Sequence, residues 1–311
     1  MKKTLTVAAA ILAAVLLFVS CGPKAPTEWT SDYNAALASA KKSGSNILLY
    51  ITGDDEEGVC ENLTNTIMTS KTFMDAAKGF IAVQLTVDLS ADADQAVQDE
   101  ILEIGGRLGL QYYPTIVCMT PDEKVFADIF FDPDYSSLES MTSDMKDAVE
   151  KAGTVAKLKK TIEKETGAKK VEAIDTLLKT IPDEFFNQYA ELAMEIPELD
   201  PENKSGLVGT YKILFAQNDA MADLFSGNFE SAVMIYDDLA SDPTLTADDV
   251  QQCYFYGASL WYYIQDWEHC FEYLQKAIDA APDSENAGRI ADTLNQLQIT
   301  LELSTMTGDT E

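Results

Sequence analysis

The chain has 311 residues and a formal net charge of −30, from 22 lysines and arginines against 52 aspartates and glutamates. Such a negative chain repels nucleic acids and anionic lipid head groups, which excludes binding to either by charge. One histidine and five cysteines leave few metal ligands, and we expect neither a metal nor a cofactor. The length allows two domains with separate cores.

The N-terminus combines a basic start, an apolar run and a cysteine among small residues. The apolar run, Val7 to Val19, is short for a membrane-spanning helix, which needs about 20 residues. Phe18 to Gly22 reads FVSCG, which resembles a lipobox cleaved before Cys21 by the lipoprotein signal peptidase. The resemblance implies a signal peptide over 1–20 and a mature chain anchored by lipid on Cys21, facing the periplasm. Gly22 is not a retention signal of the Asp type, which favours the outer over the inner membrane. An uncleaved membrane anchor is the alternative.

The mature chain opens on a tether and an amphipathic helix. Residues 21–28 contain two prolines and are expected to form the tether. Ser31 is a candidate N-cap, and Lys41 to Gly44 ends the helix with cations and glycine. The apolar residues that share one face of this helix are Tyr33, Ala36, Leu37 and Ala40.

A buried strand and an acidic turn follow. Ile47 to Ile51 is an unbroken apolar run too short for a helix, which predicts a central strand buried on both faces. After Thr52-Gly53, apolar residues return at helical spacing from Cys60 onwards. The acidic loop Asp54 to Glu57 between them is expected at the C-terminal edge of a sheet, where α/β folds place their chemistry.

The next segments alternate between helix and strand patterns. Pro114 precedes a β-branched run and is expected to begin a strand rather than lie inside it. Pro121 to Lys124 is expected to be a hairpin turn. The predicted elements are helical turns over Ser70 to Lys78, strands over Phe80 to Asp88, Thr115 to Met119 and Val125 to Phe131, and a helix over Asp94 to Leu108.

From Trp29 to Phe131 the order of elements resembles the thioredoxin fold. The specific marks are the Thr-Gly turn after the first strand, the cysteine at position 60 and the Tyr-Pro-Thr segment. The resemblance implies a cis bond before Pro114, facing the active-site helix. Glu57 stands where the first catalytic cysteine is usual, and Glu56 stands where tryptophan is usual. Because glutamate cannot attack a disulfide, the dithiol chemistry of the family is contradicted, and we do not expect a dithiol oxidoreductase.

Cys60 has two possible roles. Its acidic flank opposes ionisation of the thiol, and its place on the apolar stripe favours a buried packing residue over a reactive monothiol. The acidic loop itself is explained by the preference of carboxylates for helix N-termini, although it leaves cation binding as an alternative. Besides Cys21, the cysteines Cys60, Cys118, Cys253 and Cys270 are scattered over apolar runs. This favours buried free thiols over disulfides.

Residues 133–181 are expected to form a helical connector. The segment from Lys151 to Lys179 carries eight lysines in an otherwise acidic chain, which indicates a solvated helical surface or docking to an acidic partner. Gly153 and Gly167 are expected to break the connector into separate helices.

Residues 182–303 contain patterns of consecutive helices. Segments at Gly227 to Ala232 and at Tyr254 to Pro282 resemble tetratricopeptide repeats, with Asp266-Trp267 at the turn of the second. Two repeats do not stand alone, so helices over Phe185 to Glu195 and Leu207 to Leu224 are expected to cap them. The fold class predicted is an α/β thioredoxin-like domain, 29–132, followed by an all-α tetratricopeptide-like domain, and a polar tail over 304–311.

The favoured function is a lipid-anchored scaffold or adaptor that binds a protein or peptide through its helical domain. Phe255, Ser259 and Tyr262 are expected to form a stripe lining the groove of the repeats, because exposed aromatic patches commonly mark interaction surfaces. The alternative is that a final helix bearing Leu294, Leu297 and Leu301 covers this stripe. The alternative functions are monothiol exchange or peroxide sensing through Cys60, and cation binding at the acidic loop.

Overall fold

The computed structural model describes Pro26 and residues 28–53, 58–88, 90, 93–110 and 112–308, with side chains described through 303. The predicted signal peptide, Cys21 and the acidic loop 54–57 lie outside the described residues. The chain divides into two compact units, Met1–Lys157 with Thr180–Gln188 and Leu158–Lys179 with Tyr189–Glu311. In the part of the chain that the structure describes, no helix has the length and hydropathy needed to cross a membrane.

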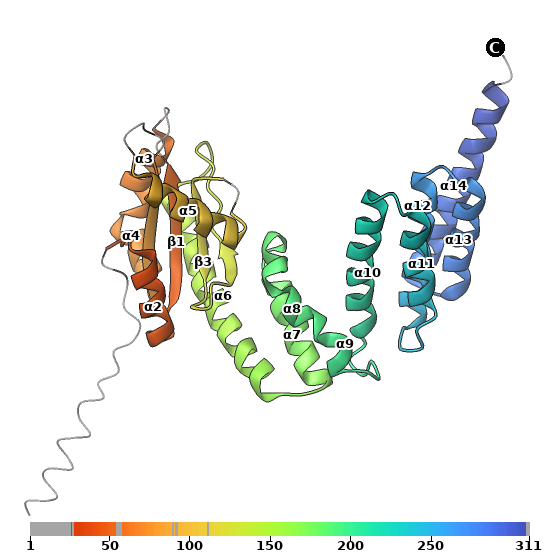
Figure 1. Ribbon diagram of the computed structural model, residues 1–311, viewed down its shortest axis with the longest axis horizontal. Coiled ribbons are helices and arrows are strands. Elements are labelled where there is room, and N and C mark those ends of the chain that lie inside the picture. Colours follow the sequence, from red (N-terminus) through yellow and green to blue (C-terminus); the bar gives the residue numbers. More distant parts are fainter. Residues whose placement is uncertain are drawn as a thin grey trace, which may run out of the picture. The chain divides into compact units, whose positions relative to one another are not determined.

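The N-terminal unit is built on a four-stranded mixed sheet in the order β2-β1-β3-β4, and Figure 1 labels the two inner strands, β1 and β3. β1 (Asn46–Gly53) runs parallel to β2 (Phe80–Val87) and antiparallel to β3 (Thr115–Met119), which pairs antiparallel with β4 (Val125–Asp128). The residues of β1 from Ile47 on are buried, which confirms the predicted central strand. Ile51 pairs with Thr115, so the C-terminal end of β1 lies beside the start of β3.

Capping residues determine where the helices of this unit begin and end. α2 (Tyr33–Ser43) packs on β1 and β2 and is capped by Asp32, whose carboxylate accepts the Ala35 N–H at 2.9 Å. The predicted cap, Ser31, is one residue too early, because the aspartate carboxylate reaches this backbone N–H. α5 (Gln95–Leu108) packs on β2, and with Asp94 as its N-cap it agrees with the helix predicted over Asp94 to Leu108. Gly109 ends it in a left-handed conformation. α4 (Lys71–Ala76) is capped by Ser70.

The turn between β3 and β4 has glutamate in a left-handed conformation. Glu123 has φ 59°, a conformation that costs a residue with a Cβ about 1 kcal/mol or more. Its carboxylate accepts hydrogen bonds from Tyr33 Oη and from Arg107, both at 2.7 Å. These bonds lower the pKa of Glu123 although burial acts to raise it, and they hold the turn without glycine. The predicted strand to Phe131 ends earlier, at Asp128.

The connector contains one long helix and one shorter helix. α6 (Leu138–Lys164) runs through Gly153, so the predicted break at this glycine is wrong. Glycine in a helix costs roughly 1 kcal/mol relative to alanine, and the buried stripe of α6, which includes Met141 and Met145, offsets that cost. The predicted break at Gly167 is confirmed, because this residue has φ 58° and precedes α7 (Ala168–Thr180).

The segment predicted as a helix over Phe185 to Glu195 is instead a 3₁₀-helix, η3 (Asp183–Tyr189), followed by the short α8 (Ala190–Met194). Gln188 explains the difference. Its amide donates to the Leu108 carbonyl at 2.8 Å, and its Oε1 accepts the Val125 N–H at 2.7 Å. These two partners are distant in sequence, so the helical pattern is overridden by tertiary hydrogen bonds.

The remaining helices pack in succession, each against the next (Figure 1). A corner at Asp200 separates α9 (Ile196–Leu199) from α10, and the Asp200 carboxylate accepts the backbone N–H groups of Lys204 and Ser205. The later elements are α10 (Val208–Phe225), α11 (Phe229–Ala240), α12 (Ala247–Tyr263), α13 (Trp267–Ala280) and α14 (Glu285–Gly308). α14 thus extends into residues 304–311, where a tail was expected.

Close helix packing in this region depends on small residues. A Cβ added to Gly257 would lie 2.7 Å from the Tyr273 ring of α13, so only glycine admits that ring. Cys270 is 1% exposed and belongs to the same core, which agrees with the packing role expected for it. Thr246 and Asp249 form a reciprocal capping box at the start of α12.

Candidate functional site

Cys60 lies at the start of the short helix α3 (Val59–Leu63) and is only 2% exposed. Gly58 precedes this helix in a left-handed conformation, with φ 69°. Glu57 falls immediately before Gly58 in the sequence and lies outside the described residues. Cys60 is therefore buried at the start of a helix. This is the position at which the resemblance places the second active-site cysteine.

A cluster of hydroxyl groups attaches this helix to β1. The Tyr50 ring is fully buried, and its hydroxyl lies 2.9 Å from Thr52 Oγ1 and 3.0 Å from Thr64 Oγ1. Thr64 Oγ1 in turn donates to the Cys60 carbonyl at 2.8 Å. The backbone around Cys60 is thus held by buried hydrogen bonds, which become costly to break in a low-dielectric interior.

Trp29 donates a hydrogen bond to the helical turn that follows α3. After α3 the chain continues as a π-helix, η2 (Thr64–Met68), in which the Met68 carbonyl accepts the Trp29 Nε1–H at 3.1 Å. The Trp29 ring also meets Tyr50 edge-on, with ring centroids 5.9 Å apart. π-helical turns are rare and often occur at functional sites. Here the wide turn leaves a carbonyl that the N-terminal tryptophan satisfies.

The loop before β3 has the conformation that the resemblance implies. The Tyr113–Pro114 peptide bond is cis, and Thr115 Oγ1 donates to the Tyr112 carbonyl at 2.7 Å. The Tyr113 ring covers the backbone of Gly53 so closely that no side chain fits at that position. The Thr-Gly turn and the cis-proline segment, which the sequence presents far apart, are therefore in direct contact.

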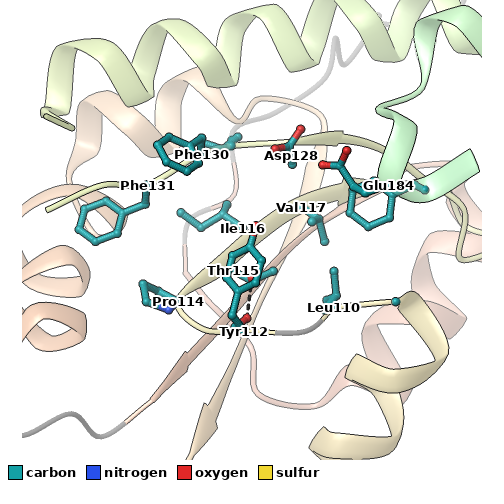
Figure 2. Close-up of a pocket in the computed structure, with 13 residues that line it drawn as sticks. Leu110, Tyr112, Pro114, Thr115, Ile116, Val117, Asp128, Phe130, Phe131 and Glu184 are labelled. Carbon is teal, nitrogen blue, oxygen red and sulfur yellow. Dashed lines mark hydrogen bonds between the residues drawn. The ribbon is translucent and has the colours of Figure 1, made fainter. Parts of the chain in front are cut away.

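A pocket of about 220 Å³ opens beside this loop. Figure 2 shows the carboxylates of Asp128 and Glu184 at one end, the rings of Phe130 and Phe131 at the other, and Tyr112 between them. Tyr112 is 70% exposed and Phe130 is 66% exposed, which is unusual for large apolar side chains. The pocket combines aromatic surface with negative charge.

A second and larger cavity, about 610 Å³, lies in the helical region. Its walls come from the first half of α12 and the first turns of α14, and we call it the α12–α14 groove. The residues that line it are Asp248, Asp249, Gln251, Gln252, Phe255, Tyr256, Ser284, Glu285, Asn286, Arg289, Ile290 and Thr293.

The three residues expected to bind a partner have different surroundings in the structure. Phe255 lines the α12–α14 groove and is half-buried against the helical core. Ser259 is exposed, and its hydroxyl donates to the Phe255 carbonyl at 3.0 Å. Tyr262 is 50% exposed, outside the groove lining, with its ring edge-on to Trp267. Leu294 and Leu297 of α14 pack on the core, yet leave Ser259 and Tyr262 uncovered.

The other cysteines are buried among apolar residues. Burial raises the pKa of the Cys118 thiol well above its usual range, and it raises the pKa of Cys253 to about 12. Burial also raises the pKa of Cys270. These thiols stay protonated at neutral pH and form no disulfide with another described cysteine. Nor do the described histidines, cysteines and carboxylates gather anywhere into a cluster able to hold a metal.

Comparison with known proteins agrees with the two-part architecture. Residues 28–121 match a family model described as thioredoxin-like. Residues 207–302 match a model described as an uncharacterised protein C-terminal domain. The N-terminal part of the chain is thus a thioredoxin-like α/β domain with a mixed sheet, and a helical region follows it.

Two individual proteins are similar over part of the chain. An uncharacterized protein of Treponema pallidum (strain Nichols) is 32% identical over 135 residues, which cover 42% of this chain and 44% of that protein. The chain therefore spans less than half the length of this relative. A solved structure of a DsbH oxidoreductase is 22% identical, with a TM-score of 0.36, and the match covers 41% of this chain and 88% of that one.

Sequence reasoning named Pro114 and Phe255 but missed most of the residues that line the two cavities. Glu184 reaches the first pocket from η3, a segment that has no sequence signal for the sheet. Phe130-Phe131 was interpreted as strand, whereas Phe130 is exposed beyond the end of β4. That pair of aromatics directly before Asp132-Pro133 was the one available signal for an exposed aromatic rim.

Proposed function

We propose that the chain is a lipid-anchored, periplasm-facing protein whose thioredoxin-like domain binds rather than oxidises or reduces, and whose helical region acts as a scaffold for a protein partner. The observation that carries this proposal is Cys60, which is 2% exposed and lies where thiol exchange would need an accessible sulfur. Attack on a disulfide requires a thiolate that can approach along the S–S axis. A covered cysteine, preceded in the sequence by glutamate at the usual nucleophile position, does not meet that requirement.

The cis-proline segment supports a binding role. The domain keeps the Tyr113–Pro114 cis bond and the close contact between Tyr113 and Gly53, although Glu57 occupies the usual nucleophile position. Beside them lies the aromatic pocket with exposed Tyr112 and Phe130. Exposed aromatic rings are favourable anchors in protein interfaces because they bury a large area with few rotatable bonds.

The anchoring part of the proposal rests on residues 1–22 alone. A chain with charge −30 does not adhere to anionic lipid by electrostatics, so a lipid on Cys21 would supply the membrane attachment. The repeats of the helical region, the periplasmic side and the preference for the outer membrane belong to the same proposal.

The test of the binding role compares the full chain with its Cys60→Ser variant in two assays. In the first, reduction of insulin disulfides is followed with dithiothreitol as the electron source. In the second, proteins cross-linked to the chain in the native envelope are identified. We expect insulin reduction at the background rate for both forms and the same captured proteins for both.

A result of the opposite kind would establish the enzyme class. Insulin reduction by the wild type that disappears in Cys60→Ser would assign monothiol chemistry to Cys60 and overturn the proposal. Alkylation of Cys60 in the folded chain, faster than that of an unstructured peptide cysteine, would have the same meaning.

A further inference from the structure

The α12–α14 groove has an aromatic wall and an acidic entrance. Phe255 and Tyr256 contribute rings from α12, and these rings lie 6.3 Å apart between centroids. Asp248 in the first turn of α12 and Glu285 in the first turn of α14 are both exposed. Among the described residues neither has an ion-pair partner, whereas Asp249 is occupied by the capping box.

The groove lies in an unusually one-sided charge environment. From Ile213 to Gln275 the sequence contains eleven carboxylates and neither lysine nor arginine. The groove lining itself holds three carboxylates, Asp248, Asp249 and Glu285, against one cation, Arg289, whose guanidinium contacts Asn286. An excess of negative charge in a cleft attracts ligands of opposite charge. Cations from outside are therefore attracted to the groove.

The chain shows nearby how such a surface holds an ammonium group. Lys276 Nζ lies over the Tyr273 ring at 4.4 Å from its centroid and 5.9 Å from that of Tyr254. The same Nζ forms an ion pair with Glu272 at 2.8 Å. Aromatic faces and a carboxylate together hold this cation, as cation–π and ionic attraction predict. The α12–α14 groove combines the same two chemistries without a lysine of its own in the lining.

We propose that the α12–α14 groove binds a cationic segment of a protein partner, one in which lysine or arginine alternates with apolar side chains. The apolar side chains contact Phe255 and Tyr256, and the cations pair with Asp248 and Glu285 at the entrance. Arg289 donates to a carbonyl or carboxylate of the same segment. This inference rests on the scaffold role proposed above and names the chemistry of the partner.

Binding is measured on the full chain with a defined probe. The probe is a short fluorescein-labelled peptide of alternating lysine and leucine, followed by fluorescence anisotropy. The matched probe has glutamate at every lysine position. We expect the lysine peptide to bind with an affinity that falls as salt is added, and the glutamate peptide not to bind.

Three variants place the binding in the groove. Asp248→Asn with Glu285→Gln removes the two entrance charges, and Asp238→Asn with Glu268→Gln removes two exposed charges of the same region outside the groove lining. Thr293→Trp fills the groove from α14 without changing charge. We expect the entrance variant, which loses ion pairs with the probe, and Thr293→Trp, which fills the groove, each to weaken binding by about fivefold or more. The control variant should stay within about twofold.

Three results of these binding measurements would overturn the proposal. These are equal weakening by the entrance and control variants, tight binding of the glutamate peptide, or full binding by Thr293→Trp. Sedimentation of the chain alone tests one competing occupant, a second copy of the chain bound through its lysine-rich α6 and α7. A dimer that dissociates in salt and is lost in Thr293→Trp would assign the groove to that second copy and overturn the proposal. If partners cross-linked at Phe255 in the envelope are acidic, the scaffold role stands and the cationic partner is wrong.

Discussion

The Tyr113 ring lies against the backbone of Gly53 so closely that a Cβ on Gly53 would be 2.2 Å from Tyr113 Cε2. Gly53 ends β1, and Tyr113 precedes the cis-proline that lies directly before β3. The contact joins the two segments that border Cys60 and the aromatic pocket. The glycine after Thr52 is therefore needed for its lack of a side chain.

Gly53→Ala should destabilise the chain by about 1–2 kcal/mol, since an added methyl group forces the Tyr113 ring out of place. Urea unfolding measures the loss. Tyr113→Ala removes the clash, so Gly53→Ala should cost much less in that background. Gly153→Ala is the matched control, and it should stabilise α6 by roughly 0.5–1 kcal/mol because open space surrounds that position. An equal cost of Gly53→Ala in both backgrounds would show that the ring contact is irrelevant.

Glu57→Cys should restore a disulfide-forming pair with Cys60. The spacer Gly58-Val59 has the length found between the two cysteines of the thioredoxin motif that the sequence resembles. We expect the variant to lose two titratable thiols in an oxidising glutathione buffer and to gain insulin reduction. Glu57→Ser controls for the loss of the carboxylate. A variant that keeps both thiols reduced in that buffer would contradict the placement of Cys60 as the second cysteine.

The ion pair between Lys212 and Asp242 predicts a pH dependence of stability. Burial acts to raise the pKa of Asp242, but hydrogen bonds from Lys212 and Thr244 outweigh it and lower the pKa from 3.8 to about 2. A carboxyl group whose pKa is lower in the folded chain than in the unfolded chain stabilises the fold at pH values above the unfolded pKa. This stabilisation is lost as pH falls through the folded pKa. Since the pair is partly exposed and screened, Asp242→Asn should cost roughly 1–2 kcal/mol near neutral pH.

The difference between wild type and Asp242→Asn should shrink to about half near pH 3. Urea unfolding at both pH values gives the comparison. Asp238→Asn, an exposed neighbour on α11, serves as the control and should show little effect at either pH. A cost that stays constant down to pH 3 would assign the stabilisation to shape rather than to charge.

Cys21→Ser should abolish lipidation and leave an uncleaved precursor or a protein in the wrong fraction. The reason is that the FVSCG segment resembles a lipobox, and the lipoprotein signal peptidase cleaves that motif before its lipid-modified cysteine. Membrane fractionation and mass measurement of the purified chain check the result. A variant that is still processed normally and still bound to membrane would refute the lipobox interpretation.

Phe255→Ala with Tyr262→Ala should weaken partner capture while the fold persists. Phe255 lines the α12–α14 groove, and Tyr262 is half exposed further along the same helix. Tyr263→Ala, at a position 70% exposed and outside the groove lining, is the control. Circular dichroism reports the fold, and cross-linking reports capture. An unfolded double variant would mean that Phe255 is mainly a core residue, and normal capture by a folded one would exclude the groove.

Local signals in the sequence predicted several elements of the thioredoxin-like domain and one break in the connector. The apolar run Ile47 to Ile51 predicted the central strand, the pattern from Asp94 to Leu108 predicted α5, and Gly167 marked the break. Each of these signals acts within a few residues of the structure that it determines. The cis bond before Pro114 was implied instead by the resemblance to the thioredoxin fold, and the structure has it.

The failures have sequence-distant causes. Gly153 stays helical because the buried stripe of α6 outweighs the cost of glycine. Gln188 imposes a 3₁₀-helix through its bonds to Leu108 and Val125. Both cavities are lined by side chains from segments far apart in the chain, such as Asp128 and Glu184 in the first pocket. No local sequence pattern therefore predicts either cavity.

The absence of lysine and arginine from Ile213 to Gln275 also determines how this region behaves under two common reagents. Trypsin cleaves only after lysine or arginine, so a complete digest releases most of α10 to α13 as one peptide ending at Lys276. Amine-reactive cross-linkers find no lysine in that stretch, and the first one beyond it, Lys276, is already paired with Glu272. A partner seated on these helices would escape such a reagent and be captured by carboxyl-directed or photoactivated chemistry.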